Sequence, residues 1–403
     1  MAQTFDIAII GGGIVGLSTA MALTDGPAPV PPLVIEKEAE VAQHQTGHNS
    51  GVIHSGIYYR PGSLKARYTV EGARRLVEFC QQHGIPYETC GKVVVATDAA
   101  ELPRLEELHR RGAANGVPGG VELIGPERLR EIEPHAAGIK ALHVPATGIV
   151  DYVAVARRYA ELVRERGGAI RTGTRVRGLR RDGTSWVVET TAGALRATHV
   201  VNCAGLYSDW IAQRAGCRPS VRIIPFRGEY YRLRPASEPL VRSLIYPVPD
   251  PAVPFLGVHF TRMIRGGVEA GPNAVLSFRR EGYAKTDFNV REAWSTVGFP
   301  GFWRLASKYW RTGIGEVYRS FSKRAFVQAL QRLLPELREE DLDPGGSGVR
   351  AQAIDPSGAL VDDFSIQAMG GMVHVLNAPS PAATASIPIG EAIAEQARQH
   401  FGR

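Results

Sequence analysis

The chain has 403 residues, of which 44% are hydrophobic and 22% are charged, and it carries a formal net charge of +7 at pH 7. These values are typical of a globular protein and argue against a disordered chain, and no run of eighteen apolar residues suggests a transmembrane helix. The four cysteines, Cys80, Cys90, Cys203 and Cys217, have neither C-x-x-C nor zinc-ligand spacing, so we expect reduced thiols and no metal site.

The chain begins with the pattern of a strand, a glycine-rich loop and a helix. An apolar run over residues 5–10 leads into Gly11-Gly12-Gly13-Ile14-Val15-Gly16, and the next apolar residues recur at helical spacing. Gly11 permits the tight turn, Gly13 lets the backbone approach a pyrophosphate, and Gly16 lets the helix pack on the strand. The free N–H groups at the helix N-terminus attract the phosphate charge. The sequence therefore predicts a dinucleotide-binding site at this loop.

A second predicted strand, over residues 33–35, strengthens this prediction. It ends at Glu36, whose carboxylate can accept hydrogen bonds from the hydroxyls of an adenosine ribose. A proline-rich insert over residues 27–32 moves this acid slightly beyond the usual spacing of about 20 residues. Since the strand-loop-helix pattern starts at residue 5, we expect no signal or transit peptide and a cytoplasmic protein.

Helices and short strands follow along the rest of the chain. We expect a helix from residue 64 until Gly84 and Pro86 end it, and further helices over residues 102–115, 126–132 and 152–166. Strands are expected over residues 92–96, 169–171, 175–177, 186–190 and 195–201, the last ending in the small residues 202–205. A second sheet is predicted from strands at 226–231, 255–260 and 274–278, followed by a strand at 372–376 and a closing helix at 383–400.

The predicted cofactor contacts are dispersed along the sequence. They are Gly11, Gly13, Ile14, Val15, Gly16, Glu36, Lys37, Gln45, Thr46, Asn49, Ser50, Gly51, Val52, Val176, Ala204, Gly205, Ser380, Pro381, Ala382, Ala383 and Thr384. A nicotinamide enzyme usually confines its cofactor to one contiguous nucleotide domain, so this dispersal favours FAD. We expect an α/β protein in which a Rossmann-type FAD-binding domain (residues 1–85, 151–219 and 341–403) is interleaved with a mixed β-sheet substrate domain (residues 86–150 and 220–340).

One basic and aromatic segment, residues 299–334, stands apart from the rest. It holds seven basic residues against the single acid Glu316, and aromatic residues interleave with the bases. One interpretation is a surface that meets anionic lipid, which would place the protein peripherally on the cytoplasmic face of a membrane. The other is a solvated pair of helices that packs its aromatic side chains inward. Nucleic acid is not favoured, because no recognised binding module accompanies the charge.

Three unusual strings carry a resemblance to a known family. They are residues 49–59 together with 62–67, residues 271–275, and residues 377–386. Over nearly its whole length the chain resembles the FAD-dependent D-amino-acid-oxidase-like oxidoreductases, which have the glutathione-reductase-type FAD fold. Within them it is similar to the L-2-hydroxyglutarate oxidase and dehydrogenase family. The resemblance implies oxidation of the C2 hydroxyl of this small dicarboxylate hydroxy acid to 2-oxoglutarate, with the flavin reoxidised by oxygen or by a quinone-linked membrane acceptor.

The reaction needs a base beside the flavin, because hydride leaves C2 while the hydroxyl loses its proton. His54 is the first candidate, since in this family its segment passes the isoalloxazine ring and histidine titrates near neutral pH. A structural histidine and a covalent flavin anchor are the alternatives for this residue. His259, on a predicted strand of the second sheet, is the other candidate base.

A dicarboxylate substrate also needs two cationic partners. Arg350 stands where amino-acid oxidases of this superfamily hold the α-carboxylate, and a guanidinium group suits that bidentate task. Candidates for the distal carboxylate are Lys65, Arg67 and Arg262, and candidates for hydroxyl donors are Tyr58, Tyr59 and Tyr246. The N-terminus of the closing helix is expected to favour negative charge on the reduced flavin.

Two other functions remain open at this point. One is a flavin amine oxidase of the glycine or sarcosine type, which can manage without a base if its amine binds neutral. The other is a non-catalytic flavoprotein that docks at a membrane through the segment 299–334.

Overall fold

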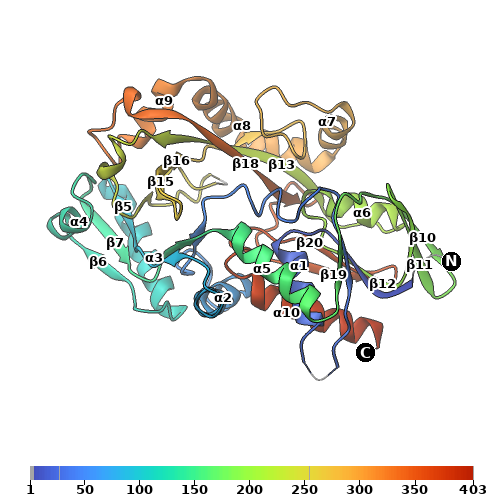
Figure 1. The fold of residues 1–403 in the computed structure, drawn as a ribbon. Helices are drawn as coiled ribbons and strands as arrows, with labels where there is room; N and C mark the ends of the chain where they lie inside the picture. The colour runs from blue at the N-terminus through green and yellow to red at the C-terminus, as the bar shows by residue number, and fades with distance from the viewer. Residues whose placement is uncertain (1–3, 27, 254, 403) are drawn as a thin grey trace.

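The computed structural model describes residues 4–26, 28–253 and 255–402. Two large β-sheets, one of eight strands and one of nine, form the body of the molecule (Figure 1). A small third sheet joins β3 (Val52–Ile53), β8 (Gly148–Val150) and β4 (Tyr87–Glu88). The chain therefore has the α/β architecture that the sequence predicts.

The eight-stranded sheet is built around the first strand of the chain. β1 (Thr4–Ile10) lies parallel between β12 (Gly193–Asn202) and β2 (Leu33–Ile35), with β9 (Ala169–Arg171) beyond β2 and β20 (Met372–Asn377) parallel to β12. Antiparallel strands β10 (Val176–Asp182), β11 (Ser185–Thr190) and β19 (Ser365–Met369) complete the sheet. The centre of β1 is apolar and fully buried because helices cover a parallel sheet on its faces.

Five helices pack near this first sheet. α1 (Ile14–Leu23) lies against α5 (Tyr152–Glu165) and α10 (Ser386–Phe401), and α10 also contacts α2 (Leu64–Gln82), as Figure 1 shows. α6 (Ser208–Arg214) contacts β10 and β20. The side chains of Ser63 and Asp151 cap α2 and α5 by accepting backbone N–H bonds, which accounts for where these helices begin.

The nine-stranded sheet takes its strands from two separate stretches of the chain. The first stretch gives β5 (Lys92–Ala96), β6 (Glu122–Ile124) and β7 (Lys140–Val144). The second gives β13 (Arg222–Leu233), β14 (Leu244–Pro247), β15 (His259–Arg262), β16 (Val268–Gly271), β17 (Val275–Leu276) and β18 (Leu342–Ile354). The helices of these stretches are α3 (Leu102–Ala114), α4 (Pro126–Ile132), α7 (Val290–Val297), α8 (Pro300–Phe321) and α9 (Lys323–Leu330).

The structure differs from the predicted elements at three places. Residues 255–258 are not part of a strand, and β15 starts only at His259. The closing helix begins at Ser386, because residues 380–385 form turns before it. β18 pairs with β13 along almost its whole length, so residues 342–354 belong to the nine-stranded sheet although the predicted FAD-binding segment starts at residue 341. Pro27, in the predicted proline-rich insert, lies outside the described residues.

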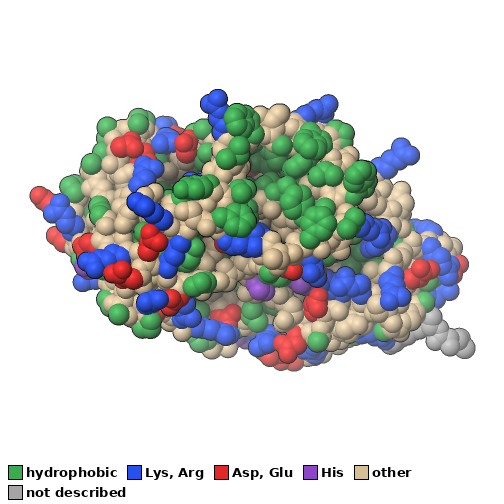
Figure 2. Space-filling model, turned by 90° about the horizontal axis from the view of Figure 1, so that it is seen from above, with side chains coloured by type: hydrophobic (Ala, Val, Ile, Leu, Met, Phe, Trp, Pro, Cys, Tyr) green, Lys and Arg blue, Asp and Glu red, His purple; other side chains and the backbone are tan. Residues whose placement is uncertain are grey.

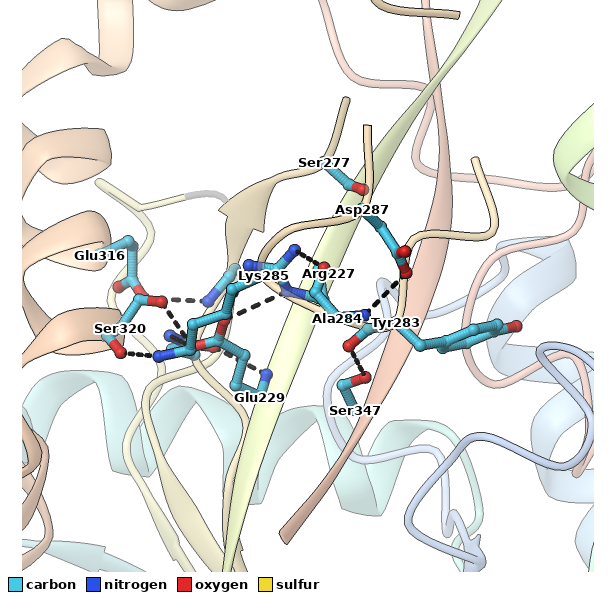
Figure 3. A network of polar contacts seen from close by, with 12 residues as sticks. Arg227, Glu229, Ser277, Tyr283, Ala284, Lys285, Asp287, Glu316, Ser320 and Ser347 are labelled. Atoms are coloured by element: carbon cyan, nitrogen blue, oxygen red, sulfur yellow. Dashed lines mark hydrogen bonds and ion pairs between the residues drawn. The ribbon is translucent and has the colours of Figure 1, made fainter. Parts of the chain in front are cut away.

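Polar networks tie the two sheets and their helices together. Arg280 and Asp209 of α6 form a fully buried ion pair, with Arg280 Nη2 2.9 Å from Asp209 Oδ2. In a second network, Glu229 of β13 accepts hydrogen bonds from Ser320 of α8 (2.6 Å) and Arg227 (2.8 Å), as Figure 3 shows. Burial raises the pKa of Glu229, but these hydrogen bonds outweigh it and the pKa is lowered overall. The carboxylate therefore anchors the end of α8 to the nine-stranded sheet.

Candidate active site

A cavity of about 1440 Å³ runs between the two sheets and is lined by residues from Ile10 to Thr384. Its walls come from the glycine loop, the segment after β2, the residues that follow β12, parts of β13 and β18, and the turns before α10. All of the predicted cofactor contacts line this cavity except Gly51. Gly51 has a φ of +67°, and a Cβ there would lie 2.7 Å from the Val150 carbonyl oxygen, so its glycine serves a close backbone approach.

The glycine loop has the shape of a phosphate cradle. Gly11 has a φ of +113°, and a Cβ there would lie 2.4 Å from the carbonyl oxygen of Cys203. A Cβ on Gly16 would lie 2.0 Å from the carbonyl oxygen of Gly11. Neither position accepts a side chain, because the loop packs closely on the end of β12 and on the start of α1, and Gly11, Gly13 and Gly16 line the cavity there.

Glu36 is held at the end of β2, facing this loop. Its Oε2 accepts a hydrogen bond from the Gly12 N–H (2.7 Å), and its Oε1 accepts one from the Glu38 N–H (2.9 Å). The proline-rich insert has therefore not displaced the acid from the glycine loop. A carboxylate at this point, beside a phosphate cradle, fits the ribose of an adenine dinucleotide.

Thr384 connects the two ends of the chain beside the cavity. Its Oγ1 accepts a hydrogen bond from the His54 backbone N–H (3.1 Å) and bonds the Tyr152 hydroxyl (2.8 Å). The segment that carries His54 is thereby fixed against the turns that precede α10. The sequence placed both segments at the cofactor, and the structure brings them into direct contact.

The two candidate bases, His54 and His259, both line the cavity. Burial, with the positive charges of Lys92 and Lys65 and the neighbouring His259, lowers the pKa of His54 to about 3. Burial also lowers the pKa of His259 to about 3, despite the hydrogen-bonding contact of its Nδ1 with the Gly257 carbonyl oxygen (2.8 Å). Both imidazoles are therefore neutral at pH 7, and each has a ring nitrogen that can accept a proton, but burial places both pKa values below the near-neutral value expected of the base from the sequence.

Arg350 and Lys65 are the two predicted cations that the structure brings into the cavity. Arg350, on β18, lies over the ring of Phe255 and has no carboxylate partner among the described residues. Lys65 lies at the start of α2, where burial lowers its pKa and Asp362 and Asp363 partly oppose that effect. Both cations are available to bind an anionic ligand.

Arg67 and Arg262 do not line the cavity, and the structure corrects these two assignments. Arg67 is exposed, since its neighbours Ala66 and Thr69 occupy the buried face of α2. Arg262 lies at the end of β15 and forms an ion pair with Glu88 at 2.6 Å. Neither side chain can hold a ligand in the cavity from this position.

The three predicted tyrosines, Tyr58, Tyr59 and Tyr246, all line the cavity. Burial raises the pKa of each of them above the ordinary value for tyrosine, so their hydroxyls remain donors at neutral pH. The sequence reasoning missed Tyr230, which also lines the cavity and whose pKa burial raises to about 12. It also missed Lys92, which lies behind Tyr58 and Tyr246. Tyr230 and Lys92 each stand alone in a predicted strand, and a single polar residue there does not indicate a binding site.

One cluster of acids and histidine, Glu38, His44 and Glu281, has the spacing of a metal site. The ammonium group of Lys37 lies inside it, 2.7 Å from Glu281 and 2.6 Å from the His44 imidazole. A cationic side chain thus already neutralises these ligands, which argues for an ion-pair network that fixes the wall of the cavity.

Comparisons with known proteins agree with this geometry. The family model described as FAD dependent oxidoreductase matches residues 6–396. The L-2-hydroxyglutarate dehydrogenase of Indibacter alkaliphilus is 52% identical, covering 98% of this chain and all of that one. The mitochondrial L-2-hydroxyglutarate dehydrogenase of Homo sapiens is 47% identical over 99% of this chain and 90% of its own. The enzyme of the same name from Escherichia coli K12 is 46% identical over 96% and 91%.

The fold is shared with a solved flavoprotein structure. The L-alpha-glycerophosphate oxidase from Mycoplasma pneumoniae with FAD bound has a TM-score of 0.80 and 21% identity, covering all of this chain and 95% of its own. The predicted flavoprotein fold is therefore confirmed. Because the family model matches residues 6–396, nearly the whole sequence, the chain belongs to the FAD dependent oxidoreductase family.

Proposed function

We propose that this protein oxidises L-2-hydroxyglutarate to 2-oxoglutarate, with FAD as the oxidant. The observation that carries the proposal is the identity of 46–52% with relatives named L-2-hydroxyglutarate dehydrogenase, over nearly the full length of the chain. The cavity supports it, since two cations that form no ion pair with a described carboxylate, Arg350 and Lys65, line the same space as two neutral histidines. FAD, when bound, supplies the acceptor for the hydride that leaves C2.

The residues of the chain bind and orient the substrate in this proposal. The Arg350 guanidinium holds one carboxylate in bidentate fashion, and the Lys65 ammonium holds the other as a point charge. His54 or His259 accepts the proton of the C2 hydroxyl at a ring nitrogen. The tyrosine hydroxyls donate hydrogen bonds to substrate oxygens, and the buried walls keep water from the reacting carbon.

An anaerobic titration tests this function. The purified holoenzyme is mixed with L-2-hydroxyglutarate and, separately, with the D enantiomer, L-malate, L-lactate and glycine, while the flavin absorbance is followed. We expect bleaching by L-2-hydroxyglutarate selectively. Bleaching by glycine instead would assign the enzyme to the amine oxidases, and no bleaching by any of the compounds would contradict a catalytic role on these substrates.

We further propose that the face formed by α7 and α8 docks on an anionic membrane surface, where a quinone-linked acceptor would be available. In the part of the chain that the structure describes, no helix is long and apolar enough to cross a bilayer. Figure 2 views the molecule from this side and shows hydrophobic and basic side chains together on the surface. Among the described residues, ten of the twelve exposed large hydrophobic residues lie from Phe278 to Phe321, including Trp294 (75% exposed), Trp310 (55%) and Phe321 (77%).

The charges around this docking face favour anionic lipid. Arg304, Lys308, Arg311 and Arg324 are exposed on α8 and α9, among the aromatic side chains. Phe326, in contrast, is buried, so the inward-packing interpretation holds for α9 but not for the outer side of α8. Exposed aromatic residues beside basic ones are the pattern of a surface that lies in the lipid headgroup region.

Sedimentation with vesicles tests the docking proposal. The holoenzyme is expected to bind vesicles containing phosphatidylglycerol more strongly than vesicles of phosphatidylcholine, and to bind less at high salt. The double variant Trp310→Glu/Phe321→Glu should lose this binding while it keeps FAD. Ile139→Glu, which changes an exposed hydrophobic residue outside this face, is the matched control. Equal binding by the double variant and the control would contradict the proposal.

A further inference from the structure

Lys92 is a buried cation that the proposed reaction does not use. It is the first residue of β5, its side chain is only 1% exposed, and its Nζ has no hydrogen-bond partner among the described residues. It forms no ion pair with any described carboxylate. Lysine is almost never fully buried without a partner, because a charge removed from water is costly unless it is compensated. The position therefore calls for an explanation.

The nearest groups to this ammonium are two tyrosine rings that form part of the cavity wall. Nζ lies 4.5 Å from the ring centroid of Tyr58 and 5.0 Å from that of Tyr246, and both tyrosines line the cavity. Attraction between the cation and the ring faces compensates part of its lost hydration. The Tyr58 hydroxyl is also buried and unpartnered. A polar ligand in the cavity would thus find an unused hydroxyl with an unpaired positive charge close behind it.

Among the described residues, no carboxylate pairs with Lys92, and the acids at this end of the cavity, Asp362 and Asp363, act on Lys65. The titratable groups are His54, Tyr58, Tyr246 and His259, and beyond the histidines lie Lys65 and Arg350. Lys92 is close enough to both histidines to lower the pKa of each. This end of the cavity therefore holds three basic side chains, and although Asp362 and Asp363 offset the charge of Lys65 in part, the charges of Lys92 and Arg350 have no carboxylate partner among the described residues and favour an anion.

Resting on the proposed function, we propose that Lys92 is a positioning residue whose ammonium charge, acting through Tyr58 and Tyr246, selects a dicarboxylate over a monocarboxylate. The Lys92 ammonium group does not line the cavity, so it does not contact the substrate directly. It acts at a distance on the total negative charge of the bound substrate. Arg350 and Lys65 can balance the two carboxylates directly, and Lys92 adds an unscreened charge behind the wall. A monocarboxylate gains less from this field than a dicarboxylate does.

This role makes binding depend on pH. Burial lowers the pKa of Lys92 to about 7, so above that pH the free protein increasingly carries a neutral Lys92. A bound dianion favours the charged form and raises this pKa, so binding above pH 7 takes up a proton. The affinity for a dicarboxylate should therefore fall as the pH rises above about 7, by up to about tenfold per pH unit.

Calorimetry on the holoenzyme tests the inference with two unreactive probes. Glutarate is a dicarboxylate without the hydroxyl group, and butyrate is a monocarboxylate. Titrations in two buffers of different protonation enthalpy, at about pH 8, should show proton uptake with glutarate in the wild type and none in Lys92→Met. At about pH 6 the variant should bind glutarate about tenfold more weakly, with little change for butyrate.

A matched control separates this effect from general damage. Lys140→Met makes the same change on the neighbouring strand β7, where the lysine Nζ pairs with Glu106 at 3.1 Å, and it should behave like the wild type. If the wild type takes up no proton on binding glutarate, the inference is overturned whether or not Lys92→Met folds. If a folded Lys92→Met keeps the wild-type pH dependence, it is overturned as well.

Flavin bleaching and proton uptake test two separate properties, the reaction of the enzyme and the charge of Lys92. Bleaching of the wild-type flavin by L-2-hydroxyglutarate depends on the reaction and not on Lys92. Bleaching without proton uptake would leave the proposed function standing and remove the role of Lys92. Absence of bleaching would remove the proposed substrate, on which the inference rests.

Discussion

At the scale of single residues, the two buried histidines invite a direct comparison. His54 and His259 both have a pKa lowered to about 3, chiefly by burial, so neither needs to lose a proton before it can act as a base. One of the two variants His54→Gln and His259→Gln should remove the base. We expect that variant to slow flavin reduction by L-2-hydroxyglutarate by about 10²- to 10⁴-fold. Anaerobic stopped-flow absorbance measures this rate directly.

The other histidine serves as the control in that experiment. A residue that only packs or orients should change the substrate concentration needed for half-maximal reduction more than it changes the limiting rate. Retention of flavin through acid precipitation of the protein would report a covalent link, and loss of that link in His54→Gln would identify His54 as the anchor. Unchanged limiting rates in both variants would contradict a histidine base.

Lys92 should also leave a signature in the stability of the protein. Burial lowers its pKa from 10.5 to about 7, so between these two pH values the unfolded chain binds more protons than the folded one. The free energy of unfolding therefore rises with pH across this window. The cost of burial reaches roughly 5 kcal/mol at pH 7 and below, and it fades as the pH approaches 10.5.

Urea unfolding of the wild type and Lys92→Met measures this cost. The variant should be the more stable of the two near pH 7, and its advantage should shrink by roughly 3 kcal/mol towards pH 9.5. The wild type would then have a lower free energy of unfolding than Lys92→Met, while it binds the dicarboxylate more tightly. Equal pH dependences in the two proteins would show that Lys92 keeps its ordinary pKa in the folded protein and would contradict the burial of its charge.

At the scale of elements, the buried ion pair between Asp209 and Arg280 holds α6 against the segment that follows β17. Arg280 also lies over the Trp210 ring, 4.5 Å from its centroid, and Asp209 accepts the Ile223 N–H at 3.1 Å. Asp209→Asn would leave the guanidinium group buried without its counter-charge. We expect a loss of about 3–5 kcal/mol in the free energy of unfolding, measured in urea.

The surface pair Arg196–Asp182 provides the matched control for this prediction. Its atoms are also close, at 2.7 Å, but both side chains are about 40% exposed. Asp182→Asn should cost at most about 1 kcal/mol, because water already screens the pair. Similar losses in the two variants would contradict the assignment of the Asp209 pair as a buried anchor.

The cofactor contacts could be predicted from the sequence where they lie in one local segment, and not where they depend on residues far apart in the chain. The glycine loop, Glu36 and the segment 380–384 were predictable, because each contact is encoded by a local string with its own backbone requirement. The assignment of Arg67 to the substrate could have been excluded from the sequence, because Ala66 and Thr69 form the buried face of α2 and residue 67 lies on its exposed side. Lys92 was not predictable, because a lysine at the start of an apolar strand resembles a solvated strand end. Its burial depends on Tyr58 and Tyr246, which are far away in sequence.

At the scale of the whole molecule, the cavity makes FAD part of the structure. Its walls come from both large sheets and from residues as distant as Ile10 and Thr384, so the cofactor should contribute to the stability of the entire chain. We expect removal of FAD to lower the melting temperature, and a thousandfold excess of FAD over its Kd to restore about 4 kcal/mol. Differential scanning calorimetry of the apo and reconstituted forms measures the change.

A variant of the cradle completes that experiment. Gly16→Ala would place a methyl group 2.0 Å from the Gly11 carbonyl oxygen, so it should bind FAD poorly and show little stabilisation when FAD is added. Identical melting temperatures of the apo and reconstituted wild type would contradict a structural contribution of the cofactor.

The order of strands in the eight-stranded sheet has a consequence for biosynthesis. β1 precedes its partner β12, which starts at residue 193, and the neighbour of β12, β20, follows only at residue 372. β2 can pair with one edge of β1 early, but the other edge of this apolar strand stays unpaired until residues 193–202 are translated. Such long-range closure slows folding and exposes the chain to aggregation, so we expect the yield of active enzyme to depend on translation speed and chaperone supply.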